Sequence, residues 1–149
     1  MWEQLRRFSA LPGSARRLFM WAAFLLPLLA LSLRVSGFQS TRRRLLKRWS
    51  RPPTGSAESE QQVQLTTRMV LAAARCSLVR VTCLERSLAL WWLLGRQGIA
   101  SQLRIGVRTD NQKFAAHAWV ECQGLALGEP EAPHLHYAAF SEEMSGDFS

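Results

Sequence analysis

Residues 81–99, VTCLERSLALWWLLGRQGI, are the part of the sequence that most restricts the fold. Thr82, followed three residues later by Glu85, forms a capping box, in which the two side chains satisfy free backbone N–H groups at a helix start. Apolar residues then recur at helical spacing: Leu84, Leu88, Trp91 and Trp92. The pattern predicts a helix that begins with Cys83 and buries one face in a core.

A thiol in the first turn of a helix lies near the positive end of the helix dipole. This position stabilises a thiolate and makes the sulfur a better nucleophile. Cys83 is therefore a candidate nucleophile, although most free cysteines are simply small buried hydrophobes. Cys76 lacks such a setting, and we expect it to be structural.

The three cysteines form an odd set with no regular spacing, and no convincing secretory signal is present. A reducing cytoplasm is therefore expected, without a disulfide framework. With 149 residues, the chain is long enough for one domain with a proper core and too short for two.

The net charge of +8 is concentrated in residues 1–51, which contain eleven Lys and Arg residues and one acid, Glu3. An uncharged, mostly apolar run from Leu18 to Leu33 lies within this segment, with Pro27 near its centre. A transmembrane helix needs about 20 such residues, so the run is short for a span. Three interpretations remain open: a core or interface helix, a helix on the membrane surface with its arginines among the headgroups, and a true span.

Six basic residues follow this run: Arg42, Arg43, Arg44, Lys47, Arg48 and Arg51. Residues 16–51 could therefore contact anionic lipid or an acidic peptide, although a solvated helix face is the commoner explanation of such a cluster. Nucleic acid is not expected as a partner. Trp49 is the cluster's one base-stacking side chain, and no nucleic-acid-binding motif is present.

Residues 52–60 combine Pro, Gly and Ser with few apolar groups, which is typical of a linker. We therefore expect a basic, apolar N-terminal helical segment at 1–51, a linker at 52–60, a core at 61–140 and a flexible acidic tail at 141–149.

The periodicity of the chain changes from helical to alternating beyond Gly98. Residues 59–75 predict a helix that packs against the Cys83 helix, whereas residues 103–108 alternate as a half-exposed strand. A polar turn, a return strand at 114–122 and a short strand at 125–127 follow. Helices followed by an antiparallel meander make an α+β fold.

His117 lies in the middle of the return strand, where small alanines leave room for its imidazole. A lone strand histidine is more often a core or surface residue. Its combination with Cys83 changes this expectation, because a thiol enzyme needs a base within hydrogen-bond reach and a third group that orients the base. We expect that group on the next strand or just past it.

Two segments, TCLERSLALWWLLGRQGIASQLRIGVR and FAAHAWVE, resemble the transglutaminase-like cysteine proteases of lasso peptide biosynthesis. These are the B proteins, which remove the leader from the lasso precursor, and the resemblance covers roughly residues 60–135. It implies a transglutaminase-like, papain-like core of helices packed on a small antiparallel sheet. It also implies a cysteine peptidase with a Cys–His–Asp triad, Cys83 as the nucleophile, His117 as the base and no cofactor.

The chain departs from the family pattern at the third position. The family usually has an Asp where this chain reads LALGEPEAP, and the nearest acids are Glu129 and Glu131. Glu129 lies closer to the expected place, and a Glu can accept the imidazole N–H as an Asp does. We expect Glu129 to take this role, with Glu131 as the alternative, although Glu129 beside Pro130 could equally be a solvated turn carboxylate.

Some family members carry a small leader-recognition domain, and the chain has no room for one between its basic helix and its core. The resemblance therefore implies a stand-alone protease half acting on the leader region of a lasso precursor. A separate leader-recognition protein and an ATP-dependent macrolactam synthetase would be its partners, and its location would be cytoplasmic or membrane-associated.

Two other functions remain open. One is a transglutaminase-like acyltransferase that uses the same three residues, and the other is a non-catalytic membrane-associated adaptor. A zinc site can be drawn from Cys122, His134 and His136. An H-x-H pair with a distant Cys is a weak signal for zinc, so no metal is expected.

Overall fold

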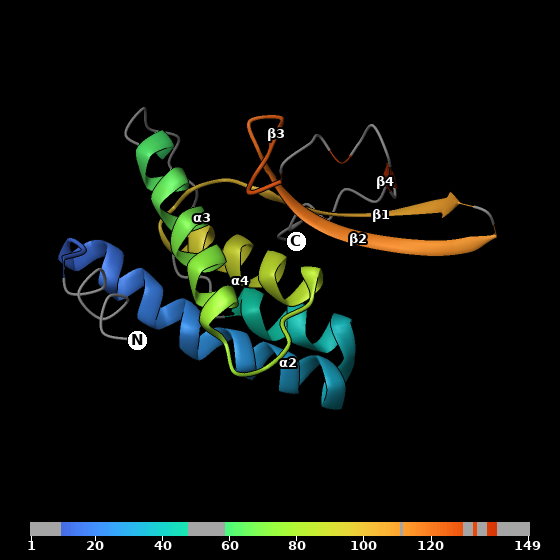
Figure 1. Ribbon diagram of the computed structural model, residues 1–149, viewed down its shortest axis with the longest axis horizontal. Helices are drawn as coiled ribbons and strands as arrows, with labels where there is room; N and C mark the ends of the chain where they lie inside the picture. The colour runs from blue at the N-terminus through green and yellow to red at the C-terminus, as the bar shows by residue number, and fades with distance from the viewer. Residues whose placement is uncertain (1–9, 48–58, 111, 130–132, 134–136, 140–149) are drawn as a thin grey trace.

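The computed structural model describes residues 10–47, 59–110, 112–129, 133 and 137–139 (Figure 1). Most of the predicted linker at 52–60 and the whole predicted tail at 141–149 lie outside these residues. Several residues considered above also lie outside them: Arg48, Trp49, Arg51, Glu131, His134 and His136.

The apolar run forms part of α2, a helix from Gly13 to Lys47 that continues through Pro27 and bends sharply at Gly37. Gly37 has φ 73° and ψ 174°, a conformation that is essentially restricted to glycine. The Ser32 and Thr41 hydroxyl oxygens are 2.9 Å apart, whereas nine residues of straight helix would separate them by about 13 Å. The chain therefore turns back at Gly37, and α2 consists of two helical arms.

The inner face of α2 is part of the hydrophobic core. Its buried residues recur at helical spacing: Ala15, Leu18, Ala22, Leu25, Leu26, Leu29 and Ala30. They pack against the next two helices, α3 (Ser59–Cys76) and α4 (Cys83–Arg96). By length and composition α2 could cross a membrane, but one third of its most apolar window is buried inside the protein. The helix is thus a core element on one side, and its other side is exposed.

Polar contacts add to the apolar packing of the three helices. The Trp92 indole N–H on α4 donates to the Leu45 carbonyl at 3.2 Å, which ties α4 to the second arm of α2. The Gln97 amide, just after α4, donates to Thr66 of α3 at 3.0 Å. Paired polar groups of this kind cost little when they are buried and fix the orientation of the helices.

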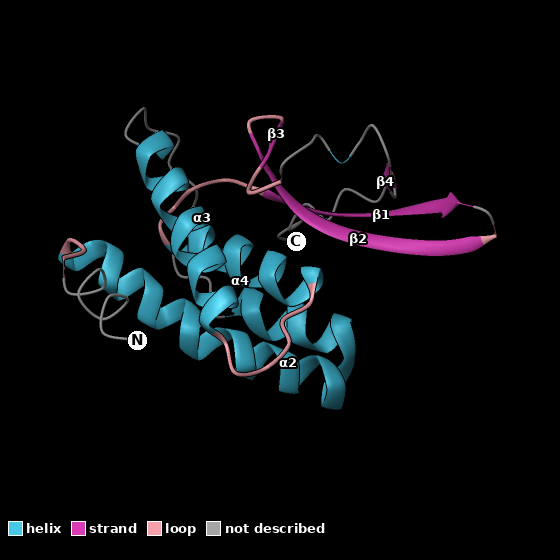
Figure 2. Cartoon of the chain, in the orientation of Figure 1, coloured by secondary structure: helices cyan, strands magenta, loops and turns pink. Residues whose placement is uncertain are grey.

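The sheet contains four strands, β1 (Gln102–Asp110), β2 (Lys113–Cys122), β3 (Leu125–Ala126) and β4 (Ala138–Ala139). Their order is β3-β2-β1-β4, and every neighbouring pair is antiparallel (Figure 2). The predicted meander of three strands and the α+β arrangement are confirmed. The sequence pattern missed β4, which is two residues long and adds to the other edge of β1.

The two faces of the sheet are covered by different elements. Leu103, Val120 and Cys122 belong to the core that includes α4. The opposite face was predicted to be exposed along β1, but Gly106 on that face is buried. A Cβ at Gly106 would lie 2.9 Å from atoms of both Trp119 and Tyr137, so these two side chains cover the strand there.

Candidate active site

Cys83 is the first residue of α4, as the capping box predicts. Thr82 is the N-cap, its Oγ1 accepts the Glu85 backbone N–H at 3.3 Å, and the Glu85 carboxylate accepts the Thr82 N–H at 2.8 Å. The thiol is only partly buried. It therefore combines the helix-start position with access from solvent, which a nucleophile requires.

Ser87 joins α4 to the strand that carries His117. Its hydroxyl donates to the Ala118 carbonyl at 2.9 Å, and this hydrogen bond is buried. Residues four apart lie near the same side of a helix, and Cys83 is one turn before the residue that contacts β2. The contact of Ser87 with the residue next to His117 places the start of α4 beside the histidine's part of the strand.

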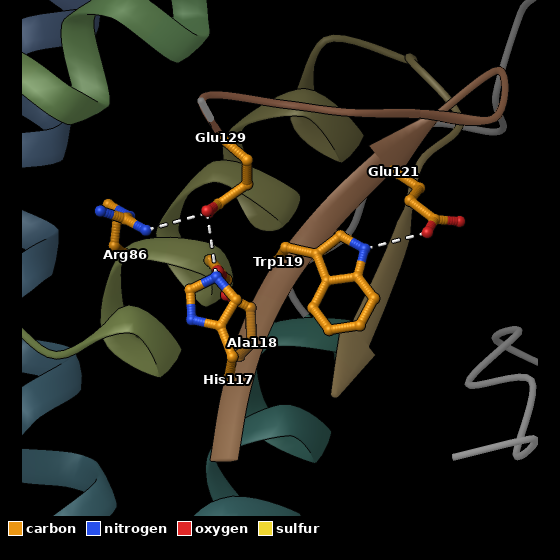
Figure 3. Close-up of polar contacts among 7 residues, drawn as sticks. Arg86, His117, Ala118, Trp119, Glu121 and Glu129 are labelled. Atoms are coloured by element: carbon orange, nitrogen blue, oxygen red, sulfur yellow. Dashed lines mark hydrogen bonds and ion pairs between the residues drawn. The ribbon is translucent and has the colours of Figure 1, made fainter. Parts of the chain in front are cut away.

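Glu129 is bonded to both His117 and Arg86 (Figure 3). Its Oε2 lies 3.1 Å from His117 Nε2, and its Oε1 accepts a hydrogen bond from Arg86 Nη2 at 3.1 Å. The Glu129 side chain is 11% exposed, against 30% for Arg86. A single carboxylate therefore joins the imidazole of β2 to the helix that begins with Cys83.

The turn before Glu129 is fixed against α3. Gly128 has φ 69°, and a Cβ on it would lie 3.2 Å from side-chain atoms of Thr67 and Leu71. The positive φ and the close approach both favour glycine. This packing delivers the Glu129 carboxylate to His117 from the end of the turn that follows β3.

Aromatic rings lie beside the imidazole on the face of the sheet opposite Leu103 and Val120. The His117 and Trp119 ring centroids are 6.0 Å apart with nearly parallel planes, and Tyr137 lies 5.2 Å from His117. Trp119 is held in turn by Glu121, which accepts its indole N–H at 2.9 Å (Figure 3) and also accepts from Arg104 at 3.2 Å. These rings pack beside the imidazole and limit its movement.

The other two cysteines differ from Cys83. Cys122 is buried, burial raises the pKa of its thiol above the ordinary value of 9.0, and its sulfur lies 3.5 Å from the Ala100 carbonyl. Cys76 is exposed at the end of α3, so it is not part of the hydrophobic core. Among the described residues, no group of three His, Cys, Asp or Glu side chains could hold a metal ion.

A cavity of about 290 Å³ adjoins Arg86 between α3, α4 and the turn at Gly128. Six residues line it: Leu71, Ala74, Arg75, Val81, Arg86 and Gly128. Two of them are arginines, Arg75 on α3 and Arg86 on α4. The cavity provides open space beside Arg86 and Gly128.

Sequence reasoning missed Arg86, Ser87 and Tyr137. The two α4 residues could have been found, because they lie three and four positions after Cys83 and hence on the same helix face. Tyr137 carries no local signal, since its contact with His117 depends on a segment that returns to the edge of β1.

The arrangement as a whole can support acyl transfer through a thiol. It supplies a cysteine at a helix start, an imidazole on the adjoining strand and a carboxylate that holds the imidazole. These are the residue types that nucleophilic catalysis by a thiol requires.

Comparison with known proteins identifies the family. A model of the transglutaminase-like superfamily matches residues 25–142, a range that contains Cys83, His117 and Glu129. No curated protein and no solved structure matches the chain. Members of the superfamily are generally cysteine-protease-like or acyltransferase-like enzymes, and the superfamily part of the resemblance is confirmed. Because the match covers more than half of its residues, the chain belongs to the transglutaminase-like superfamily.

Proposed function

We propose that the protein is a cysteine peptidase that removes the leader from a lasso peptide precursor before macrolactam formation. The observation that carries the proposal is the hydrogen bond of 3.1 Å between Glu129 and His117, beside the helix that begins with Cys83. The motifs around Cys83 and His117 resemble the leader peptidases of this class, which gives the substrate class.

In the proposed mechanism, His117 Nε2 is bonded to Glu129, so Nδ1 is the nitrogen that accepts the Cys83 thiol proton. The thiolate attacks the carbonyl carbon of the bond between leader and core, and a tetrahedral oxyanion forms. The Cys83 backbone N–H is one donor to this oxyanion, because the first N–H groups of a helix have no intrahelical partner. The imidazolium then protonates the leaving amine of the core peptide.

Water completes the reaction. It attacks the thioester carbonyl while His117 takes its proton, and the leader leaves with a free carboxylate as the thiol is restored. Glu129 stabilises the imidazolium and holds the tautomer that carries its proton on Nε2. The chemistry needs only the residues of this chain and water, and we propose that it takes place in the cytoplasm.

The test is cleavage of a lasso precursor by the full chain, with a leader-recognition protein supplied. We expect Cys83→Ala and His117→Ala to lower kcat by at least about 10³-fold, since groups that act as a unit cause large losses singly. Cys76→Ala, which removes the exposed thiol on α3, is the matched control and should keep full activity. Circular dichroism checks that each variant is folded.

Mass analysis of the products separates hydrolysis from acyl transfer. Hydrolysis gives leader and core with one water added across the cleaved bond, whereas an acyltransferase joins the leader to an added amine. Full activity in Cys83→Ala would end the proposal. An amine adduct as the main product would assign the same three residues to an acyltransferase.

A further inference from the structure

The outer face of the first arm of α2 is exposed and apolar along its middle. Between Arg17 and Arg34, all the exposed residues are uncharged and apolar: Met20, Trp21, Ala23, Phe24, Pro27, Leu28 and Leu31. Phe24 is 66% exposed and Leu31 is 61% exposed. A helix on the surface of a water-soluble domain normally carries charged and polar residues there, so this face is built for an apolar environment.

The inner face of the same arm holds the helix in the domain. Leu26 is fully buried, and Leu29 is 2% exposed, in the core shared with α4. A transmembrane orientation would withdraw these side chains from the core and expose to water the apolar surfaces of α3 and α4 that they cover, at a cost of about 25 cal/mol per Å². The arm therefore presents its outer face while it stays packed on the domain.

Basic residues surround this face. Six exposed cations lie at the ends of the first arm and on the second arm: Arg16, Arg17, Arg34, Arg43, Arg44 and Lys47. Residues 10–47 contain no acid. The positive charge is therefore not neutralised within α2, and it complements an anionic surface.

A groove of about 590 Å³ lies between the two arms and continues the apolar face. Its walls include Trp21, Leu28 and Val35, and Arg44 and Lys47 are among the residues that line it. The groove thus combines apolar walls with ammonium and guanidinium groups, which suits an acyl chain attached to an anionic headgroup.

We propose that the outer face of α2 docks on the surface of an anionic phospholipid bilayer, with its apolar residues in the acyl boundary and its arginines among the headgroups. A helix face that packs against one partner helix is a narrow apolar stripe flanked by charged residues. Here, by contrast, every exposed position between Arg17 and Arg34 is apolar. Trp21 and Phe24 are also the residue types that settle at a membrane interface. The inference is independent of the proposed peptidase activity.

Vesicle flotation of the full chain tests the proposal. We expect binding to vesicles of phosphatidylglycerol and phosphatidylcholine, and weaker binding to phosphatidylcholine alone. The variant Phe24→Glu/Leu31→Glu should bind at least about tenfold more weakly, because two apolar anchors are lost. The matched control is Phe114→Glu/Leu78→Glu, which changes two residues that are 81% and 105% exposed elsewhere on the surface and should bind as wild type.

Two further measurements test whether binding depends on the basic residues and whether the helix spans the bilayer. Arg43→Gln/Arg44→Gln should weaken binding to the anionic vesicles by roughly tenfold and leave binding to neutral vesicles unchanged. Alkaline carbonate should release the bound protein, since the helix does not span. Cys83→Ala should bind like wild type, which separates this proposal from the catalytic one.

Three results would overturn the inference. The first is equal binding of wild type and Phe24→Glu/Leu31→Glu to vesicles, and the second is resistance to carbonate extraction. The third is the absence of vesicle binding together with self-association or partner binding that the same two substitutions abolish. That last result would assign the face to a protein interface.

Discussion

Replacement of Glu129 by Gln tests the candidate site most directly, because both carboxylate oxygens have defined partners. Oε1 accepts from Arg86, and Oε2 is bonded to His117 Nε2. A Gln side chain offers one oxygen and one NH₂ group, and an arginine can only donate. The amide oxygen must therefore face Arg86, and the NH₂ group must face His117.

This orientation imposes the wrong tautomer on the imidazole. His117 Nε2 would have to accept a hydrogen bond from the amide, so the ring proton would move to Nδ1, the nitrogen that we assign to the thiol. The loss of one hydrogen bond to a charged group costs about 1.5–3 kcal/mol, which corresponds to roughly 10- to 150-fold in rate. Tautomer inversion in a comparable triad lowers kcat by about 10⁴-fold. We expect Glu129→Gln to lower kcat by between about 10² and 10⁴.

A second substitution should restore part of the activity. In Arg86→Met/Glu129→Gln nothing forces the amide oxygen away from His117, so the amide can rotate and accept the Nε2 proton. This double variant should be at least about tenfold more active than Glu129→Gln. Arg86→Met alone should lose less than about tenfold, because the ion pair is partly exposed and such pairs contribute about 1 kcal/mol.

Two assays measure the effect. One is kcat/KM for precursor cleavage, and the other is the alkylation rate of Cys83 by iodoacetamide, followed by peptide mass analysis that separates Cys83 from the other thiols. Glu60→Gln is the control, since Glu60 is an exposed acid in the first turn of α3. A double variant no more active than Glu129→Gln would refute the reasoning.

Three further predictions concern the framework of the site. Gly37→Ala should destabilise the protein by about 1–3 kcal/mol in urea unfolding, since the space around Gly37 is open but its φ of 73° strains any other residue; an unchanged midpoint would argue against the chain reversal. Gly106→Ala should cost about 1–3 kcal/mol and slow alkylation of Cys83, because its Cβ would press on Trp119 and Tyr137 at 2.9 Å; normal stability and reactivity would contradict this. Burial raises the pKa of the Cys122 thiol above 9.0, so the folded state should lose stability relative to the unfolded chain as the pH rises past about 9, and Cys122→Ala should flatten this decline.

The local elements could be read from the sequence because local interactions determine them. The capping box at Thr82 and Glu85 depends on residues three positions apart, and the structure contains both of its hydrogen bonds. The alternation along residues 103–108 predicts a strand, and β1 and β2 form where the sequence predicts them. Their burial does not alternate, because Gly106 and residues 118–120 are all buried. His117 and Glu129 were selected by residue type and order, and the structure brings them together.

The remaining features depend on contacts between distant segments. A glycine at position 37 is compatible with a continuing helix, and only the packing of both arms of α2 against the domain reveals the reversal there. The strand β4 is two residues long, which is too short for a periodic signal. The spacing to Cys83 places Arg86 on the right face of α4, but its pairing with Glu129, 43 positions away, carries no local signal.

The contact of Tyr137 with His117 has a consequence for synthesis on the ribosome. The three helices and the β1–β2 hairpin precede Tyr137 in the chain, so they can pack before this residue leaves the exit tunnel. A nascent chain that ends before Tyr137 already contains the thiol and the imidazole, but one side of the imidazole ring is uncovered. Of the two rings that contact the imidazole, Tyr137 is the second to be translated, so the imidazole is covered on both sides only after Tyr137 has left the tunnel.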